Sequence, residues 1–369
     1  MVAAPAAEVG DDASTVVEEE LEEPQLPYVA PAPAVLPRPL AFITGATSGI
    51  GLQVACELLR RNQHDLILCC REDNPGAADA ARALFKAAVS GREAQEEGVP
   101  PPVCSFLPLE LSQLPSVADC ASACATLCAE RGQTINLVIL CAGAGDLASP
   151  DVLGATPVMA PGGWEHTFSV NFIGHAALIR HFLDQHPSCL AQGARVTAVS
   201  CGRHTHAWRV DPENWDFCRP GRPWWAKPPW VNPFRRGDAY NNAKAVLTTW
   251  ALRLDAVYGP SGRLSATVVD PGLVPGTRLL RAAGSTHDFA WQHMGSPLAA
   301  FVNKVVTPAE AAADILNGAA NVAAFPVGGV YFHGATPSKA AKQCYDAGLQ
   351  AALWSASPEM MGGAQWPKP

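Results

Sequence analysis

The segment between residues 40 and 70 constrains the fold of this chain more than any other. The apolar run 40–43 (Leu-Ala-Phe-Ile) predicts a buried strand, and it leads directly into a glycine-containing stretch at 44–51. Apolar residues then recur at helical spacing between Leu52 and Leu59, the helix is predicted to end near Arg61, and a second apolar strand is predicted at 66–70. Strand, glycine turn, helix and strand in this order indicate an α/β fold with a parallel sheet.

The glycine turn is suited to binding a phosphate group. Its spacing, Gly-x-x-x-Gly-x-Gly, allows a tight turn and a close approach to the backbone. A pyrophosphate could then lie on the amide groups and the positive dipole end of the helix that follows. The residues expected to bind this ligand are Gly45, Thr47, Ser48, Gly49, Ile50 and Gly51.

Tyr240 and Lys244 are a second pair of chemical interest. Their four-residue spacing puts a phenol and an ammonium group on one face of a predicted helix. A neighbouring ammonium favours the phenolate, so we expect the pKa of Tyr240 to be lowered from about 10 toward neutrality. A tyrosine of this kind can exchange a proton with a substrate.

The glycine turn and the Tyr240-x-x-x-Lys244 motif together resemble the short-chain dehydrogenase/reductase family, and further motifs follow in the family's order. The segment 140–143 resembles the family's Asn-Asn-Ala-Gly motif, although only Ala142 and Gly143 match. The segment 170–175 resembles the helix that carries the catalytic asparagine, here Asn171. The resemblance covers residues 38–335 and implies an enzyme with a single doubly wound Rossmann domain, in which helices flank a mostly parallel sheet.

The resemblance also implies roles for the site residues. Tyr240 would donate a proton to a carbonyl group or accept one from an alcohol, while Lys244 would lower the pKa of the tyrosine and bind the nicotinamide ribose. Asn171 would hold a water molecule that links Lys244 to solvent. The strand at 195–201 resembles the one that ends at the family's catalytic serine, a position taken here by Cys201 and preceded by Ser200.

Three interpretations of this strand end stay open. Cys201 could polarise the carbonyl, but a thiol is a weaker hydrogen-bond donor than a hydroxyl and turnover would be slow. A shift of one residue would bring Ser200 to the site instead, because successive strand side chains face opposite sides. In the third interpretation the chain is a regulatory or scaffold protein that binds cofactor with weak or no turnover.

The residue after the second strand predicts the choice of cofactor. An acidic residue there would bind the ribose of NAD, whereas Arg71 could bind the 2′-phosphate of NADP. We therefore expect NADPH to be preferred over NADH, although Asp73 could weaken the preference. Glu110 stands where the family usually has an aspartate beside the adenine. The remaining expected cofactor-binding residues are Leu111, Ala142, Gly143, Asn171, Tyr240, Lys244, Pro271, Gly272 and Val274.

The segment 202–239 is an insertion rich in tryptophan and proline. A connection of this length is usually functional, and its place beside the catalytic strand would let it form a wall of the substrate pocket. Similar insertions occur in the retinol-dehydrogenase and protochlorophyllide-reductase-like branch. The expected substrate is a bulky hydrophobic carbonyl or alcohol, such as a retinoid, steroid, aldehyde or ketone. Alternatively, the loop packs on itself.

Outside the catalytic domain, predicted at 39–335, the chain carries two further segments. Residues 1–38 form an acidic, Ala/Pro-rich arm that is predicted to be disordered. Residues 336–369 are predicted to form a helix, at 339–353, and a tail; this helix could pack on the core or on a second subunit in a homodimer. Three of the twelve cysteines, Cys120, Cys124 and Cys128, share a helical face, but no histidine lies near them and no metal site is expected.

Charge and hydropathy exclude several classes of function. A net charge of −8 gives no electrostatic basis for binding nucleic acid. No run of eighteen apolar residues is present, so no membrane span is expected. The start of the chain is acidic and has no apolar signal region, which predicts a cytoplasmic protein.

Overall fold

The computed structural model describes residues 37–73, 76–93, 101–145, 156–207, 209–218, 234–274, 305–363 and 365–369. By its internal contacts the chain divides into residues 1–36 and residues 37–369, and all described residues belong to the second unit. The predicted disordered arm lies outside the described residues, except for its last two. Arg38 already belongs to the second unit, because its Nε donates to the Asn62 carbonyl at 3.1 Å.

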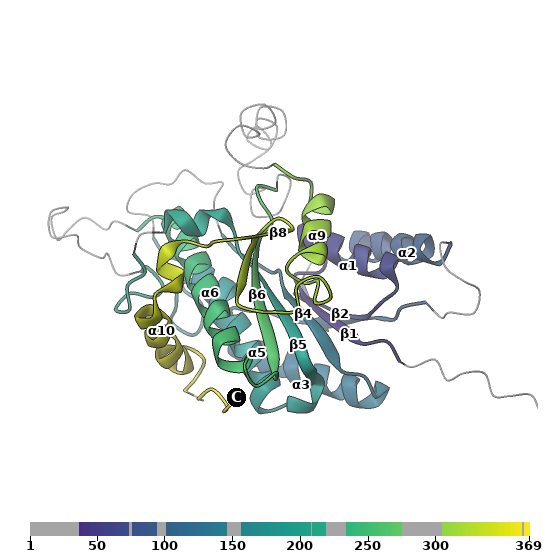
Figure 1. The fold of residues 1–369 in the computed structure, drawn as a ribbon, viewed down its shortest axis with the longest axis horizontal. Coiled ribbons are helices and arrows are strands. Elements are labelled where there is room, and N and C mark those ends of the chain that lie inside the picture. Colours follow the sequence, from purple (N-terminus) through teal and green to yellow (C-terminus); the bar gives the residue numbers. More distant parts are fainter. Residues whose placement is uncertain are drawn as a thin grey trace, which may run out of the picture. The chain divides into compact units, whose positions relative to one another are not determined.

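An eight-stranded sheet forms the centre of the second unit, in the order β3-β2-β1-β4-β5-β6-β7-β8 (Figure 1). Neighbouring strands from β3 to β7 run parallel, and only β8 pairs antiparallel, with β7. This confirms the predicted doubly wound, mostly parallel sheet. The strands are β1 (Leu40–Thr44), β2 (Asp65–Cys70), β3 (Cys104–Pro108), β4 (Ile135–Leu140), β5 (Leu190–Val199), β6 (Leu264–Asp270), β7 (Val330–His333) and β8 (Thr336–Ser338).

Helices cover both faces of the sheet (Figure 1). One hydrophobic cluster packs α1 (Gly49–Arg61), α2 (Ala77–Glu93) and α9 (Pro308–Asn317) on one face. On the other face lie α3 (Leu114–Arg131), α5 (Gly174–Asp184) and α6 (Arg236–Tyr258), with α10 (Ala347–Met360) against α6. All five residues of β1 are buried, as expected for a strand covered on both faces. Shorter elements are α4 (His166–Phe168) and the turns η1 (Ser169–Ile173), η2 (Pro187–Cys189), η3 (Gly202–His206) and η4 (Lys342–Tyr345).

The order of the strands determines where a ligand can bind. The chain winds outward from β1 in both directions, to β2 and β3 on one side and to β4 and later strands on the other. In such sheets ligands bind beyond the carboxyl ends of the strands at this switch point. The glycine turn follows β1 directly and therefore lies at that place.

The C-terminal region differs from the prediction in its boundaries. The predicted helix at 339–353 is wrong at both ends, because η4 is a 3₁₀ turn, α10 begins only at Ala347, and α10 continues to Met360. Asp346 sets this start, since its side chain accepts from the Leu349 N–H at 2.8 Å. Helix α9 begins after Thr307, with a complete capping box between Thr307 and Glu310. Within the part of the chain described above, no helix is long and apolar enough to cross a lipid bilayer.

Candidate active site

A cavity of about 950 Å³ opens at the carboxyl ends of the parallel strands. Its wall combines the glycine turn with the ends of β2, β4, β5, β6 and β7 and the first turns of α6. Every predicted site residue lines this cavity apart from Asn171, which lies behind Gly143. The lining thus includes Gly45, Thr47, Ser48, Gly49, Ile50, Gly51, Arg71, Glu110, Leu111, Ala142, Gly143, Ser200, Cys201, Tyr240, Lys244, Pro271, Gly272 and Val274.

The glycine turn has the geometry of a cradle for a phosphate group. Gly45 and Gly49 adopt φ angles of +69° and +54°, a region that side chains disfavour. Gly45 also lies so close to Ala142 that a Cβ on it would come within 2.9 Å of the Ala142 Cα. Ser48 precedes α1 but makes no side-chain cap, so it leaves the first amides of the helix to other partners. These features fit a pyrophosphate at this helix end.

A buried histidine joins the glycine turn to the helix that carries Asn171. The Thr44 Oγ1 accepts hydrogen bonds from the amides of Cys141 and Ala142 at 2.9 and 3.0 Å, so its proton is directed to His175 Nε2 at 3.0 Å. The other ring nitrogen, Nδ1, then donates to the Asn171 carbonyl at 3.3 Å. Burial lowers the pKa of His175 from 6.5 to about 3, so the imidazole is neutral at physiological pH. Sequence analysis did not identify this residue.

Asn171 lies in η1, a π-helical turn, a form that often marks functional sites. Its Nδ2 donates to the carbonyls of Ala144 and Thr167 at 2.6 and 2.7 Å. Its Oδ1 is buried without a partner. A Cβ placed on Gly143 would lie 2.9 Å from this oxygen and 3.7 Å from Lys244 Nζ, so the oxygen and the ammonium group flank Gly143. An unpartnered buried acceptor of this kind fits a bound polar group.

The pKa of Tyr240 is not lowered as predicted. Burial of the phenol, with the neighbouring Cys201, raises its pKa well above 10. The Lys244 Nζ donates to the Val199 carbonyl at 2.9 Å and lies 5.8 Å from the centre of the tyrosine ring. Burial also lowers the pKa of Lys244. The four-residue spacing brings the two side chains together, but their burial outweighs the expected effect of the ammonium group.

The end of β5 directs Cys201, and not Ser200, toward Tyr240. The Ser200 Oγ lies 2.8 Å from Thr248 Oγ1 and donates to the Lys244 carbonyl at 3.4 Å, which turns it toward the interior of α6. Cys201 and Tyr240 both line the cavity, and each influences the pKa of the other. Burial raises the pKa of Cys201, so the group is a neutral thiol. Of the interpretations open from the sequence, the geometry favours those in which Cys201 takes the serine position.

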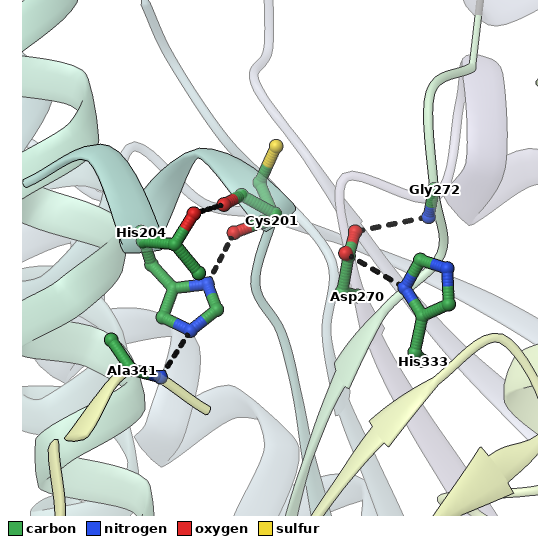
Figure 2. Close-up of polar contacts among 8 residues, drawn as sticks. Cys201, His204, Asp270, Gly272, His333 and Ala341 are labelled. Carbon is green, nitrogen blue, oxygen red and sulfur yellow. Dashed lines mark hydrogen bonds and ion pairs between the residues drawn. The ribbon is translucent and has the colours of Figure 1, made fainter. Parts of the chain in front are cut away.

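Two histidines that the sequence analysis did not single out hold the surrounding loops (Figure 2). His204 Nε2 accepts from the Ala341 amide at 3.0 Å, so its Nδ1 donates to the Cys201 carbonyl at 2.8 Å. His333, at the end of β7, places its Nδ1 3.1 Å from Asp270 Oδ2. Local sequence could not predict these contacts, because 137 residues separate His204 from Ala341 and 63 residues separate Asp270 from His333. The parallel register of β6 and β7 brings Asp270 and His333 side by side.

Two charged residues at the part of the cavity where the adenine is expected, Arg71 and Glu110, interact with neighbouring side chains. Arg71 Nε lies 3.5 Å from Asp73 Oδ1, and both side chains are more than half exposed. Such an exposed ion pair contributes little to stability, so Arg71 can leave Asp73 to bind a more strongly charged group. The Glu110 Oε1 accepts from both the amide and the hydroxyl of Ser112, at 3.0 and 2.7 Å. The longer side chain of glutamate thus bends back onto its own turn.

The tryptophan- and proline-rich insertion is only partly described. Residues 208 and 219–233, with four of its tryptophans, lie outside the described residues. Trp215 is buried in the core, where its carbonyl accepts from Asn242 Nδ2 at 2.6 Å. Phe234 lines the cavity together with Val158. The same wall also carries polar side chains that the prediction of an apolar pocket did not include, namely Arg203, His206, Arg236 and Lys339.

Comparison with known proteins agrees with this geometry. No family model matches the chain. Human polyprenol dehydrogenase is 26% identical over 336 residues, which cover 89% of this chain and 88% of that protein. A probable oxidoreductase of Streptomyces antibioticus is 31% identical over 244 residues, which cover 65% of this chain and 66% of that protein.

Solved structures share the fold at low sequence identity. The landomycin C-6 ketoreductase with bound NADP and rabelomycin matches with a TM-score of 0.52 and 18% identity, over 81% of this chain and 96% of that one. The NADPH-bound carbonyl reductase from chicken fatty liver matches with a TM-score of 0.52 and 17% identity, over 83% of this chain and 100% of that one.

The fold and these relatives define the class of protein: the chain shares its fold with solved reductases, among them a short-chain dehydrogenase/reductase of Serratia marcescens, and is similar in sequence to proteins named dehydrogenase and oxidoreductase. It is an enzyme of the oxidoreductase class.

Proposed function

We propose that this enzyme transfers a hydride between NADP(H) and the carbonyl or alcohol group of a bulky hydrophobic substrate, with Tyr240 as the proton donor and acceptor. The observation that carries the proposal is that Tyr240, Lys244 and Cys201 line the same cavity as the glycine turn, with Lys244 Nζ 5.8 Å from the centre of the Tyr240 ring. A cofactor on the turn and a substrate beside the phenol would share this cavity. We propose residues 39–335 as the catalytic domain.

The cofactor-binding part of the proposal rests on the glycine turn and on Arg71. The uncapped start of α1 would receive the pyrophosphate, and the exposed guanidinium of Arg71 would bind the 2′-phosphate. When bound, NADPH would supply the hydride. Lys244 would hold the nicotinamide ribose, and the unpartnered Asn171 Oδ1 would bind a water molecule beside it. Two solved structures of this fold carry NADP or NADPH, which supports the choice of cofactor.

The chemistry proposed for the chain's own residues is a single proton transfer. In carbonyl reduction, Tyr240 would donate its phenolic proton to the substrate oxygen, and the Cys201 thiol would donate a weak hydrogen bond to the same oxygen. Because a thiol polarises a carbonyl less than a hydroxyl does, we expect a slow enzyme. The buried, neutral His175 would keep the Asn171 backbone in place through its Nδ1.

The substrate class follows from the cavity wall and from one relative. Phe234 and Val158 offer apolar surface at the cavity, and the similar human protein is named for its action on polyprenol. A long-chain isoprenoid alcohol, or the matching aldehyde, is therefore the first substrate to test. Retinoids, steroids and other hydrophobic ketones complete the panel.

The test uses Tyr240→Phe, which keeps the ring and removes the acidic proton. We expect loss of turnover with each substrate of the panel, followed by cofactor absorbance, while NADPH binding measured by fluorescence is unchanged. Tyr258→Phe is the matched control, because that hydroxyl donates to the Pro367 carbonyl, outside the residues that line the cavity. Turnover retained by the Tyr240 variant would remove this residue from the mechanism.

A second candidate function is a cofactor-binding regulatory protein with little turnover. The observation in its favour is the thiol at the serine position. Binding of NADPH without turnover of any aldehyde, ketone or quinone would support this alternative over the enzyme proposed above.

A further inference from the structure

The cavity has a basic end, which the function proposed above does not use. Three segments contribute to it, namely η3, the first turn of α6 and the segment from β7 to the residue after β8. Their basic residues at the cavity are Arg203, His206, Arg236, His333 and Lys339. The acidic residues in the described wall of the whole cavity are fewer, namely Glu110, Glu165 and Asp270.

Each of these acidic side chains is already engaged within the chain. Glu110 accepts from Ser112, and Glu165 Oε2 accepts from the Phe168 amide at 2.8 Å. Asp270 Oδ1 accepts from the Gly272 amide at 3.0 Å, and its Oδ2 lies 3.1 Å from His333 Nδ1. The basic end of the cavity is therefore suited to an anionic ligand.

The sheet separates this basic end from the glycine turn. The turn follows β1, whereas His333 ends β7, and β7 lies four strands from β1 in the sheet. Four strand spacings amount to about 19 Å. A pyrophosphate on the glycine turn would therefore lie away from the basic end, and Arg71, which follows β2, is one strand further still. The basic end is left for the substrate.

The loop after Cys201 is packed directly on the end of β7. A Cβ built on Gly202 would come within 2.9 Å of Asp270 Oδ2, the same oxygen that meets His333. The ring of His204 lies 5.2 Å from that of Tyr331, measured between their centres. These contacts place η3 and the β7–β8 segment beside each other at the cavity.

Arg203 has the geometry of an anion-binding residue. Its Nε donates to Asn241 Oδ1 at 2.8 Å, and Asn241, the residue after Tyr240, is only 4% exposed. This buried amide holds the guanidinium but does not neutralise it. Among the described residues, Nη1 and Nη2 have no hydrogen-bond partner. Two such terminal nitrogens match the two oxygens of a carboxylate or phosphate group.

His333 adds a second, oriented donor or acceptor. The Asp270 carboxylate is 4% exposed and accepts from Nδ1, which fixes the imidazole ring (Figure 2). The side chain of His333 is 46% exposed, and its Nε2 has no partner among the described residues. An anion at this end of the cavity would favour the protonated ring, which donates through Nε2.

We infer that the substrate carries an anionic group, a carboxylate or a phosphate, that binds to Arg203 with His333 and Lys339 nearby. The inference rests on the proposed function and adds a substrate class to it, a hydrophobic carbonyl compound or alcohol with a negative charge. Arg203 comes two residues after Cys201, which limits the separation of their Cα atoms to about 7 Å. The anionic group should therefore lie about the width of one aromatic ring from the reacting carbon.

Three aldehydes that differ only at one end test this inference. They are para-formylbenzoate, its neutral methyl ester and para-formylphenyl phosphate. Binding to the full chain is measured by titration calorimetry in the presence of NADP⁺, which has no hydride to transfer to an aldehyde. We expect at least one anion to bind about tenfold more tightly than the ester, because hydrogen bonds to charged groups are the strong ones. The anion that binds more tightly identifies the group as carboxylate or phosphate.

Arg203→Gln removes the charge but keeps an amide that can donate to Asn241. We expect the tenfold preference for the anion to be lost, while the ester binds as before. Arg203→Lys keeps the charge without the paired nitrogens and should retain part of the preference. Lys339→Gln is a second variant at an exposed position, suited to the case in which the Arg203 variants do not fold, and should lower the preference about twofold.

Arg82→Gln is the matched control. Arg82 is an exposed arginine on α2 that pairs with Asp79, and it does not line the cavity. This variant should leave the preference for the anion unchanged.

Two results would overturn the inference. One is equally tight binding of the ester and both anions to the unmodified protein, and the other is an anion preference that survives in a folded Arg203→Gln variant. In either case NADPH could still reduce the ester, and loss of this turnover in Tyr240→Phe would leave the proposed function standing. Turnover retained by Tyr240→Phe is the separate outcome that would remove the proposed function.

Discussion

Thr44→Val tests the hydrogen-bond network that joins the glycine turn to the Asn171 helix. Valine has nearly the shape of threonine, so the packing at this fully buried position is preserved and only the hydroxyl is lost. The hydroxyl makes three hydrogen bonds, to the amides of Cys141 and Ala142 and to His175 Nε2. Their loss leaves two amide donors and one ring nitrogen without a partner.

The expected loss of stability follows from where these three groups lie. A buried polar group left unpaired costs about 1–3 kcal/mol. The His175 ring nitrogen is fully buried and bears this penalty, whereas the amides of Cys141 and Ala142 belong to residues of the cavity wall, where water can reach them. We therefore expect the free energy of unfolding to fall by about 1–3 kcal/mol. The assay is urea unfolding followed by tryptophan fluorescence and circular dichroism.

Thr249→Val is the matched control. Thr249 is also fully buried, but its hydroxyl donates to the Ala245 carbonyl one helical turn earlier, at 2.8 Å. That carbonyl belongs to the ladder of α6, so removing the hydroxyl leaves no amide unpaired, and a loss below about 1 kcal/mol is expected. Equal losses for the two variants would refute the reasoning, because the penalty would then come from threonine burial and not from the network.

Three further predictions concern pH, catalysis and cofactor choice. Burial lowers the pKa of His175 from 6.5 to about 3, so its contribution to stability is complete above pH 6.5 and is lost as the pH falls toward 3. The loss in the free energy of unfolding is up to about 1.4 kcal/mol per pH unit. Urea unfolding at several pH values should show a weaker dependence of this free energy on pH in His175→Gln. Cys201→Ser should raise kcat for carbonyl reduction roughly tenfold, since a hydroxyl donates a stronger hydrogen bond than a thiol; no increase, with Ser200→Ala as the slower variant, would restore Ser200 as the polarising group. Arg71→Ala should weaken NADPH binding and leave NADH binding unchanged in fluorescence titrations; equal affinities of the unmodified protein for the two cofactors would contradict this role for Arg71.

The β1–α1–β2 unit shows how much local sequence can predict. Strand, turn and helix were expected within a residue or two of their observed bounds, because apolar periodicity and glycine positions report on the chain nearby. The C-terminal helix shows the limit of this approach. Its apolar pattern predicted a start near residue 339, whereas Asp346 and the packing on α6 delay it to Ala347. A periodic apolar pattern carries little information about the residue at which the helix begins.

By itself, the sequence determined the class of fold, the glycine turn and the set of residues that meet in one cavity, since each depends on motifs a few residues long. Tertiary structure decided the protonation of the site. Tyr240 and Lys244 stand four residues apart in any helix, but the depth of their burial depends on parts of the chain that are distant in sequence, such as the end of β5, whose Val199 carbonyl accepts from Lys244. The raised pKa of Tyr240 therefore follows from burial and from neighbours that only the folded sheet brings to the phenol.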